Sequence, residues 1–220
     1  WEDAHQVYNS EDAEAWRAKM AEKGWIAPTW PTAYGGGGLS REQAMILNQE
    51  MGRIKATPAS SGMGLSMIGP TLLEFGTEEQ KQKYLTPSIS GDKIGCLCIS
   101  EPFGGSDVAG MRTTAIKNGD HYVINGSKTF ITNGVLSDYL IVTAKTTPEL
   151  GNKGISIFVL DRDMAGVSAT KLNKLGWNAS DTGEIAFANV KVPVANLLGE
   201  ENKGFSYIMQ HFSLERLIMG

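Results

Sequence analysis

The chain contains little cysteine and little histidine, the residue types that most often build disulfides and metal sites. Two cysteines and three histidines occur in 220 residues. Cys96 and Cys98 would point to the same face of a strand, where such close pairs rarely form a disulfide. The histidines are scattered, whereas a zinc site takes about four ligands. We therefore expect no metal site, and two reduced thiols fit a reducing compartment.

An excess of basic charge is also lacking. Twenty basic and 24 acidic residues leave a formal net charge of −4, so the composition does not favour nucleic-acid binding. Apolar runs stay short of the roughly 20 residues of a membrane-spanning helix, and no signal peptide is visible. The chain starts at Trp1 and stops at Gly220 just after an apolar stretch, and we expect both ends to be cut.

Glycine is abundant, but phosphate-binding motifs are missing. The 26 glycines have no three-residue period, which excludes collagen. The Rossmann spacing G-x-G-x-x-G does not occur, and residues 126–129 lack the upstream glycine and the Gly-Lys pair of a Walker motif. A G-x-S-x-G nucleophile elbow is missing as well. With 41% hydrophobic residues, the chain is expected to fold as a globular protein.

Helical signals dominate before residue 93. Ser10 could cap a helix that is closed by Gly24, and Ser40 and Thr77 each begin a capping-box sequence. The apolar residues 63–75 are typical of a helix with a kink or a new first turn at its proline. The helix that follows Thr77 is expected to stop at Pro87.

After residue 93 the hydrophobic period falls to two, which indicates strands. The turn of a hairpin is expected at Asn118-Gly119. A helical pattern returns from about Asn202. Strands without long helices between them favour an antiparallel sheet or barrel, so the fold class is α+β. The strands are expected at 94–99, 113–117, 121–125, 139–144, 155–160 and 184–190.

Two segments could bind a ligand through backbone and hydroxyl groups. In 96–107 a strand ends at Ser100, and two glycines would let a ligand approach the backbone closely. Freed amides and hydroxyls at a strand end can bind a planar ring edge or an anion, although an ordinary polar turn is the alternative. In 126–134, Phe130 offers a flat face beside the hydroxyl of Thr132, unless the ring is a core aromatic.

Two later segments are also open to two interpretations. Residues 175–182 are a polar loop between strands, which could be a plain turn. Glu215 lies on the largely apolar last helix. It could be a partly desolvated carboxylate suited to proton abstraction, or a solvated helix position.

Taken together, these segments resemble the acyl-CoA dehydrogenase family over nearly the whole chain. The resemblance implies a helical N-terminal domain over 1–93, a middle antiparallel, barrel-like β-domain over 94–200, and over 201–220 the first helix of a largely missing C-terminal helical bundle. It implies FAD, bound non-covalently, and an acyl-CoA thioester substrate. The motifs that carry the resemblance are WPTAYGGGGLS at 30–40, GTEEQKQKYL at 76–85, SEPFGGSD at 100–107, NGSKTFITNG at 125–134, LGWNASDT at 175–182 and NLLGE at 196–200.

The resemblance also implies a reaction, partners and a setting. The acyl-CoA would become a 2-enoyl-CoA by α-proton abstraction and hydride transfer to flavin N5, and electrons would pass to an electron-transfer flavoprotein. The enzyme would be a homotetramer of fatty acid or amino acid catabolism, in the bacterial cytoplasm or the mitochondrial matrix. Alternatives are an acyl-CoA oxidase-like or flavin monooxygenase-like member of the same fold, or a non-catalytic fragment.

The family's cofactor residues carry over by position in the motifs. Ser100 would bring its hydroxyl to flavin N5, at the end of a strand that lines the ring edge mostly through backbone groups. Gly105 and Ser106 would face the FAD pyrophosphate, and Phe130 would lie beside the flavin. The full set of implied cofactor residues is Leu97, Cys98, Ile99, Ser100, Gly105, Ser106, Phe130, Ile131 and Thr132.

The implied substrate residues lie mainly on the last helix. Glu215 would be the catalytic base, because its Leu-Glu-Arg-Leu context matches the isovaleryl and long-chain branches of the family. A base in the part of the C-terminal domain that this chain lacks is the alternative. The implied substrate contacts are Ser106, Ser213, Leu214, Glu215 and Arg216.

Overall fold

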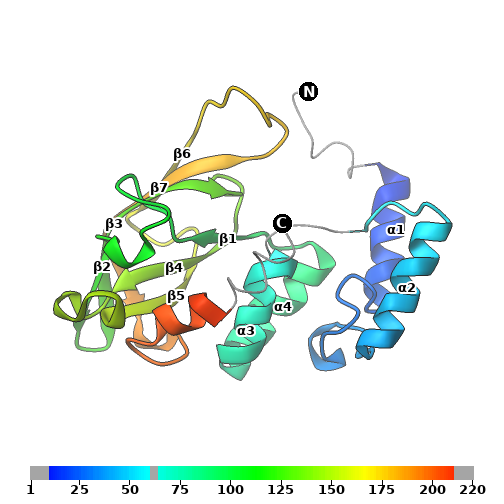
Figure 1. Cartoon of the computed structure of the whole chain (residues 1–220), viewed down its shortest axis with the longest axis horizontal. Helices are drawn as coiled ribbons and strands as arrows, with labels where there is room; N and C mark the ends of the chain where they lie inside the picture. Colours follow the sequence, from blue (N-terminus) through cyan, green and yellow to red (C-terminus); the bar gives the residue numbers. More distant parts are fainter. Residues whose placement is uncertain (1–9, 60–63, 211–220) are drawn as a thin grey trace.

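The computed structural model describes residues 10–59 and 64–210, and a helical part precedes a sheet in it (Figure 1). This confirms the predicted order of the two structural types. The helices are α1 (Glu11–Glu22), α2 (Arg41–Arg53), α3 (Gly69–Phe75) and α4 (Glu78–Ser90). The strands are β1 (Gly95–Cys98), β2 (Thr114–Asn118), β3 (His121–Thr132), β4 (Tyr139–Lys145), β5 (Ile155–Asp161), β6 (Val167–Lys171), β7 (Thr182–Pro193) and β8 (Leu197–Leu198).

The predicted helix starts are confirmed by their side-chain caps. Ser10 accepts a hydrogen bond from the Ala13 amide, and both capping boxes form, at Ser40 and at Thr77. The prediction that Pro87 ends its helix is wrong, since α4 continues to Ser90. Serine hydroxyls satisfy nearby carbonyls there, as Ser88 Oγ donates to the Tyr84 carbonyl over 2.7 Å. The helix ends one turn later than its proline.

The described strands form one sheet in the order β6-β7-β3-β2-β4-β5-β8, with β1 paired to β4. Most neighbours are antiparallel, as predicted, but β1 and β2 each pair with β4 in parallel, so the sheet is mixed. The β2–β3 hairpin lies between β1 and β4 in the chain and supplies the long crossover that a parallel pair needs. Strands β6 and β8 end this path, so the sheet is open rather than a closed barrel.

The β2–β3 hairpin turns one residue later than predicted. Asn118 pairs with His121, so the two-residue loop is Gly119-Asp120 rather than Asn118-Gly119. Gly119 has φ 65°, a value that glycine adopts without steric strain. The hairpin itself is confirmed. Strands β6 and β8 were not predicted, because β6 is short and largely exposed and β8 has only two residues.

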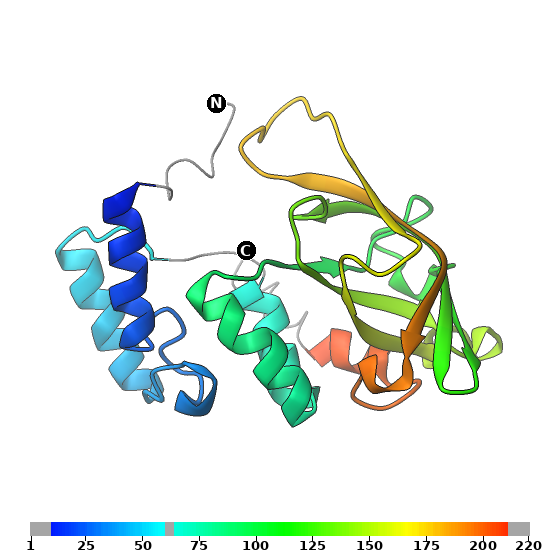
Figure 2. The same cartoon turned by 180° about the vertical axis from the view of Figure 1, so that it is seen from behind.

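Both faces of the central strand β4 are buried. Leu140 and Val142 pack into a cluster on one side of the sheet. Tyr139 and Ile141 pack on the other side, in a cluster that includes Leu72 of α3. Both views show α3 and α4 between the sheet and the α1–α2 pair (Figures 1 and 2). The helical part and the sheet therefore share a core, which holds the end of β1 in a fixed place.

Polar contacts of α4 strengthen this interface. The Tyr84 hydroxyl donates to Asp161 Oδ1 over 3.1 Å, and Lys83 Nζ lies 2.6 Å from Asp161 Oδ2. Gln80 Nε2 donates to the carbonyls of Ala195 and Leu197. The interface thus joins α4 to the end of β5, to the start of β8 and to the segment just before it.

The chain becomes helical again at residues 204–210, as predicted for the region after about Asn202. The boundaries 1–93, 94–200 and 201–220 stay predictions. No helix in the described part of the chain is long and apolar enough to cross a membrane. Across the same residues, no three or more His, Cys, Asp or Glu side chains gather in a way that could hold a metal ion.

Candidate functional site

The end of β1 presents backbone and hydroxyl groups rather than reactive side chains. Cys98 and Ile99 are buried, while Leu97 and Ser100 are half-buried. Cys98 Sγ lies 3.6 Å from Cys96 Sγ in the core, which confirms that the two thiols share a face, and burial raises the pKa of Cys98. A ligand at this strand end would therefore meet Cys98 only through its main chain.

Phe130 lies at a break in the long β3–β7 pairing. The register shifts between Lys128 and Ile131, and Phe130 has φ 58°, an outlier for an aromatic residue. Bulges of this kind re-aim a side chain, and the ring is 73% exposed, whereas its neighbour Ile131 is buried. The core-aromatic alternative for Phe130 is thus wrong. Its flat face is available to a ligand, with Thr132 half-buried nearby on the same strand.

The bulge and the end of β1 are joined by one backbone hydrogen bond. The Thr129 amide donates to the Ser100 carbonyl over 2.9 Å. This bond brings two segments that are about 30 residues apart in sequence to the same place. The two segments that sequence reasoning selected separately therefore lie together and form one candidate site.

A loop with two glycines leaves the end of β1. A Cβ atom placed on Gly105 would lie 3.6 Å from Ser100 Oγ, an ordinary contact, and one on Gly104 would lie 3.6 Å from the Asp107 carbonyl oxygen. Neither glycine has a positive φ. Packing and backbone conformation thus give no internal reason for glycine at either position. Close approach of a ligand gives such a reason, and Ser106 beside them is exposed.

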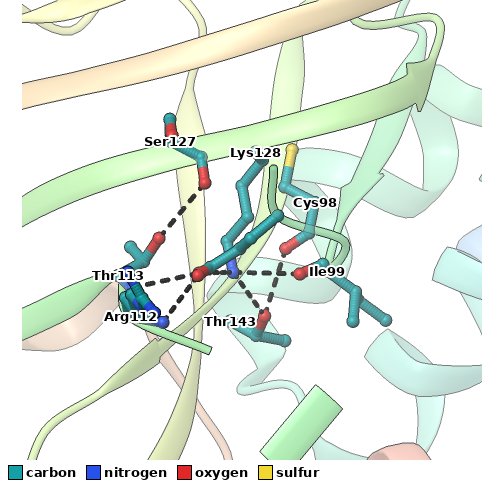
Figure 3. Close-up of polar contacts among 8 residues, drawn as sticks. Cys98, Ile99, Arg112, Thr113, Ser127, Lys128 and Thr143 are labelled. Carbon is teal, nitrogen blue, oxygen red and sulfur yellow. Dashed lines mark hydrogen bonds and ion pairs between the residues drawn. The ribbon is translucent and has the colours of Figure 1, made fainter. Parts of the chain in front are cut away.

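A buried ion pair lies behind these segments (Figure 3). Lys128 Nζ lies 2.9 Å from Glu101 Oε1, and both side chains are almost completely buried. The ammonium also donates to the Ile99 carbonyl and to Thr143 Oγ1, each over 3.1 Å. Thr143 Oγ1 in turn donates to the Cys98 carbonyl over 3.2 Å. The carbonyls of Cys98 and Ile99, at and just after the end of β1, are therefore hydrogen-bonded by buried side chains.

The charges of this pair support each other. Burial alone would raise the pKa of Glu101, but the Lys128 ammonium and hydrogen bonds from Thr113 and Arg112 keep it below its ordinary value. Burial lowers the pKa of Lys128, against the opposing attraction of Glu101. The carboxylate is fully engaged within the protein, so Glu101 is not placed to take a proton from a substrate.

Sequence reasoning missed this ion pair. Both residues lie inside the quoted motifs, but a lysine and a glutamate 27 positions apart carry no spacing signal. The available hint was that Lys128 follows the buried residues Tyr122 and Ile124 at an even spacing along one strand.

The loop over 175–182 is anchored to the turn that follows the bulge. Asp181 is buried, and its Oδ2 accepts hydrogen bonds from the Val135 and Leu136 amides over 2.9 and 3.1 Å. The Asn133 amide donates to the Asp181 carbonyl. Trp177, at the outer part of the loop, is 84% exposed with φ 53°. The loop projects from the sheet between β6 and β7 (Figure 1).

The implied cofactor residues thus come together, whereas only one of the implied substrate residues is described. Ser106 lies in the described loop. Ser213, Leu214, Glu215 and Arg216 lie outside the described residues. Two cavities border α2, a hollow of about 230 Å³ beside Met20 and an apolar groove of about 450 Å³ beside Ile46. Neither touches the site at the end of β1.

Comparisons with known proteins cover both parts of the chain. The family description "Acyl-CoA dehydrogenase, N-terminal domain" matches residues 1–92, and "Acyl-CoA dehydrogenase, middle domain" matches residues 96–190.

Individual proteins agree with these matches. The chain is 41% identical over 210 residues to mitochondrial isovaleryl-CoA dehydrogenase of Pongo abelii, covering 94% of this chain and 49% of the relative. It is 38% identical over 222 residues to the mitochondrial long-chain specific acyl-CoA dehydrogenase of Sus scrofa, covering 100% and 50%. The crystal structure of acyl-CoA dehydrogenase from Geobacillus kaustophilus has a TM-score of 0.80 at 40% identity, covering 93% of this chain and 55% of that one. The chain spans about half the length of the curated relatives it matches.

Proposed function

This chain belongs to the acyl-CoA dehydrogenase family, and from that premise we propose that the protein is an FAD-dependent oxidoreductase acting on an acyl-CoA thioester. The reaction is α,β-dehydrogenation to the 2-enoyl-CoA. The observation that carries the proposal is the junction of Ser100 with the Phe130 bulge through the Thr129 amide. It places a hydrogen-bonding strand end beside an exposed aromatic face, at the motifs that resemble the family's flavin site.

The residues at this junction fit the isoalloxazine ring and the pyrophosphate of FAD. Phe130 supplies an exposed flat face, and aromatic rings stack favourably on planar π-systems. Ser100 and Thr132 supply hydroxyl groups. Gly104 and Gly105 leave the backbone open to close approach, as a pyrophosphate requires, and Ser106 adds an exposed hydroxyl. Cys98, Ile99 and Ile131 contribute through their main chain, since their side chains are buried.

Each group of residues has a separate task in the proposed reaction. FAD, when bound, supplies the acceptor for the substrate hydride. Ser100 orients the ring edge, and Phe130 holds the ring plane and shields it from water. Hydrogen bonds to the thioester oxygen would stabilise negative charge that develops during α-proton removal. Glu215 is proposed to take that proton, with Ser213, Leu214 and Arg216 along the acyl-CoA.

The electron acceptor, assembly and location are part of the same proposal. We propose an electron-transfer flavoprotein as acceptor and a homotetramer as the assembly. The bacterial cytoplasm or the mitochondrial matrix is the proposed location. Support for the matrix comes from the two relatives named above as mitochondrial.

Anaerobic mixing of the flavin-loaded protein with a panel of acyl-CoA thioesters tests the reaction. Loss of the oxidised flavin absorption with one thioester is the expected result. A Glu215→Gln variant should keep bound flavin but lose this bleaching, because only the proton acceptor has been removed. Bleaching that persists in this variant would place the base elsewhere in the protein.

The oxidase-like alternative is separated by the same preparation in air. Rapid oxygen consumption with peroxide release on addition of acyl-CoA would indicate an acyl-CoA oxidase. A protein that takes up no flavin under any condition would indicate the non-catalytic alternative.

A further inference from the structure

The Lys128–Glu101 pair connects all three segments of the proposed flavin site. Lys128 Nζ holds the Ile99 carbonyl at the end of β1. Glu101 begins the loop that contains Gly105 and Ser106. Lys128 is followed by Thr129, whose amide donates to the Ser100 carbonyl. The next residue is Phe130, at the bulge.

Every polar group of this pair is already used inside the protein. An ammonium has three N–H donors, and that of Lys128 has three acceptors: the Ile99 carbonyl, Glu101 Oε1 and Thr143 Oγ1. Glu101 accepts from Lys128 and from the amides of Arg112 and Thr113. Neither residue has a group left over for substrate chemistry, so their contribution must be geometric.

Glu101 also closes the loop that it begins. Its main chain stands at the start of the loop, and its carboxylate binds the two amides at the loop's end, Arg112 and Thr113. Thr113 is tied to the sheet as well, since its carbonyl accepts from the Lys145 amide over 2.9 Å. One side chain thus fixes both ends of the segment that carries Gly105 and Ser106.

Stability alone is a weak reason for such a pair. Well-packed apolar residues of similar volume often stabilise a fold as well as a buried ion pair does. An apolar pair, however, could not bind the Ile99 carbonyl or the two amides. Lys128 and Glu101 differ from apolar residues because their hydrogen bonds fix the orientation of the Ile99 carbonyl and of the Arg112 and Thr113 amides.

We propose that Lys128 and Glu101 are positioning residues for the flavin, a role that rests on the function proposed above. They hold the end of β1, the Gly105–Ser106 loop and the Phe130 bulge in one arrangement that fits the isoalloxazine ring and the pyrophosphate of FAD. Thr143 assists by bridging Lys128 and the Cys98 carbonyl.

The test compares flavin binding with folding in matched variants. Glu101→Gln/Lys128→Met replaces the ion pair by a neutral pair of similar volume. Lys83→Met is the control, because it removes a lysine ion pair at α4, away from the site. For each protein, FAD affinity is measured by flavin fluorescence, stability by the urea unfolding midpoint, and the absorption spectrum is recorded at saturating FAD.

The double variant should unfold at a lower urea concentration than the wild type, because the Ile99 carbonyl loses its donor, and it should bind FAD at least ten-fold more weakly. At saturation its flavin spectrum should shift toward that of free FAD. If the substitutions only lowered stability, the variant would show the wild-type flavin spectrum at saturating FAD. Lys83→Met should match the wild type in affinity and spectrum.

Wild-type affinity and spectrum in the double variant would overturn the positioning role while leaving the proposed function intact. A wild-type protein that binds no FAD would overturn both. If the double variant does not fold, Thr143→Val, which removes only one hydroxyl from the network, replaces it. That variant should bind FAD several-fold more weakly with a shifted spectrum, and unchanged values would contradict the inference.

Discussion

The Thr129 amide donates a hydrogen bond to the Ser100 carbonyl over 2.9 Å, and this contact brings two segments distant in sequence into one candidate site. It ties the end of a parallel strand to a bulge in the longest pairing of the sheet. This junction positions the exposed Phe130 ring and the Ser100 hydroxyl. The buried Lys128–Glu101 pair lies beside it, and Lys128 donates to the neighbouring Ile99 carbonyl.

Gly105→Ala should affect ligand binding without affecting the fold. A Cβ at this position meets only Ser100 Oγ, at 3.6 Å, so the unfolding free energy should stay within about 0.5 kcal/mol of the wild type, as for neutral surface changes. FAD binding should weaken at least ten-fold, because the methyl group occupies the ligand's approach. Fluorescence titration and urea unfolding measure the two quantities.

Gly126→Ala is the matched control for that experiment. Gly126 has φ 147°, and a Cβ there would collide with Thr113, so this variant should lose stability. Equal destabilisation by both alanine substitutions would show that Gly105 serves the fold rather than a ligand.

Phe130→Asn should remove the ring while relieving the backbone. Asparagine tolerates positive φ better than an aromatic residue, and the ring buries little surface, so stability should stay within about 1 kcal/mol of the wild type. FAD affinity should fall about ten-fold. Phe158→Ala, which removes a fully buried ring of the same sheet, should instead destabilise by about 3–5 kcal/mol. Wild-type FAD affinity in Phe130→Asn would argue against a stacking role.

The Lys128–Glu101 pair should make the stability of the fold depend on pH in the acid range. The folded-state pKa of Glu101 lies below its ordinary value of 4.5, so its stabilising contribution is complete above that pH. The contribution is lost as the pH falls through the folded pKa. The wild type should therefore lose stability more steeply below about pH 4.5 than Glu101→Gln/Lys128→Met. Parallel acid-unfolding curves would contradict this.

Single substitutions in the pair should be far more damaging than the double one. Lys128→Met alone leaves a buried carboxylate without its partner and should destabilise by about 3–5 kcal/mol. The double variant should lose less than Lys128→Met, because it leaves no buried charge without its partner, although the Ile99 carbonyl still loses its donor. A double-mutant cycle of urea unfolding free energies measures the difference, and additive losses would rule out coupling between the two side chains.

Tyr139 should give the interface between α4 and the sheet a sensitivity to alkali. Burial raises its pKa to about 12, and its hydroxyl lies 2.9 Å from Ser88 Oγ. A raised folded-state pKa favours the fold at low pH, and that contribution is lost as pH rises from about 10 toward 12. Tyr139→Phe should flatten this alkaline loss in thermal unfolding, and a curve as steep as the wild type would exclude Tyr139 as its source.

Local signals in the sequence predicted much of the fold. Capping residues Ser10, Ser40 and Thr77 act within one helical turn, so the sequence alone locates the helix starts. Short apolar runs likewise located β4 and β5, which are buried on both faces. The end of α4 was misplaced at Pro87, because the helix continues past the proline and is ended by Gly91, which has a left-handed φ of 83°.

The site was predictable as a set of motifs but not as an arrangement. Motif order indicated Ser100, Gly105 and Phe130, while their junction depends on a parallel pairing of β1 with β4 that no local pattern encodes. The Lys128–Glu101 pair escaped prediction for the same reason, since long-range burial decides whether a lysine faces solvent or the core. The implied base, Glu215, lies outside the described residues and stays a prediction.

Amide hydrogen exchange with and without FAD shows directly whether the cofactor binds at the end of β1 and the bulge. FAD should slow exchange in residues 97–106, which cover the end of β1 and the loop with Gly105 and Ser106, and in the bulge at residues 128–132. Exchange in α1 and α2 should stay unchanged. Protection confined to the cavities beside α2, or no protection at the end of β1 and the bulge, would contradict this prediction.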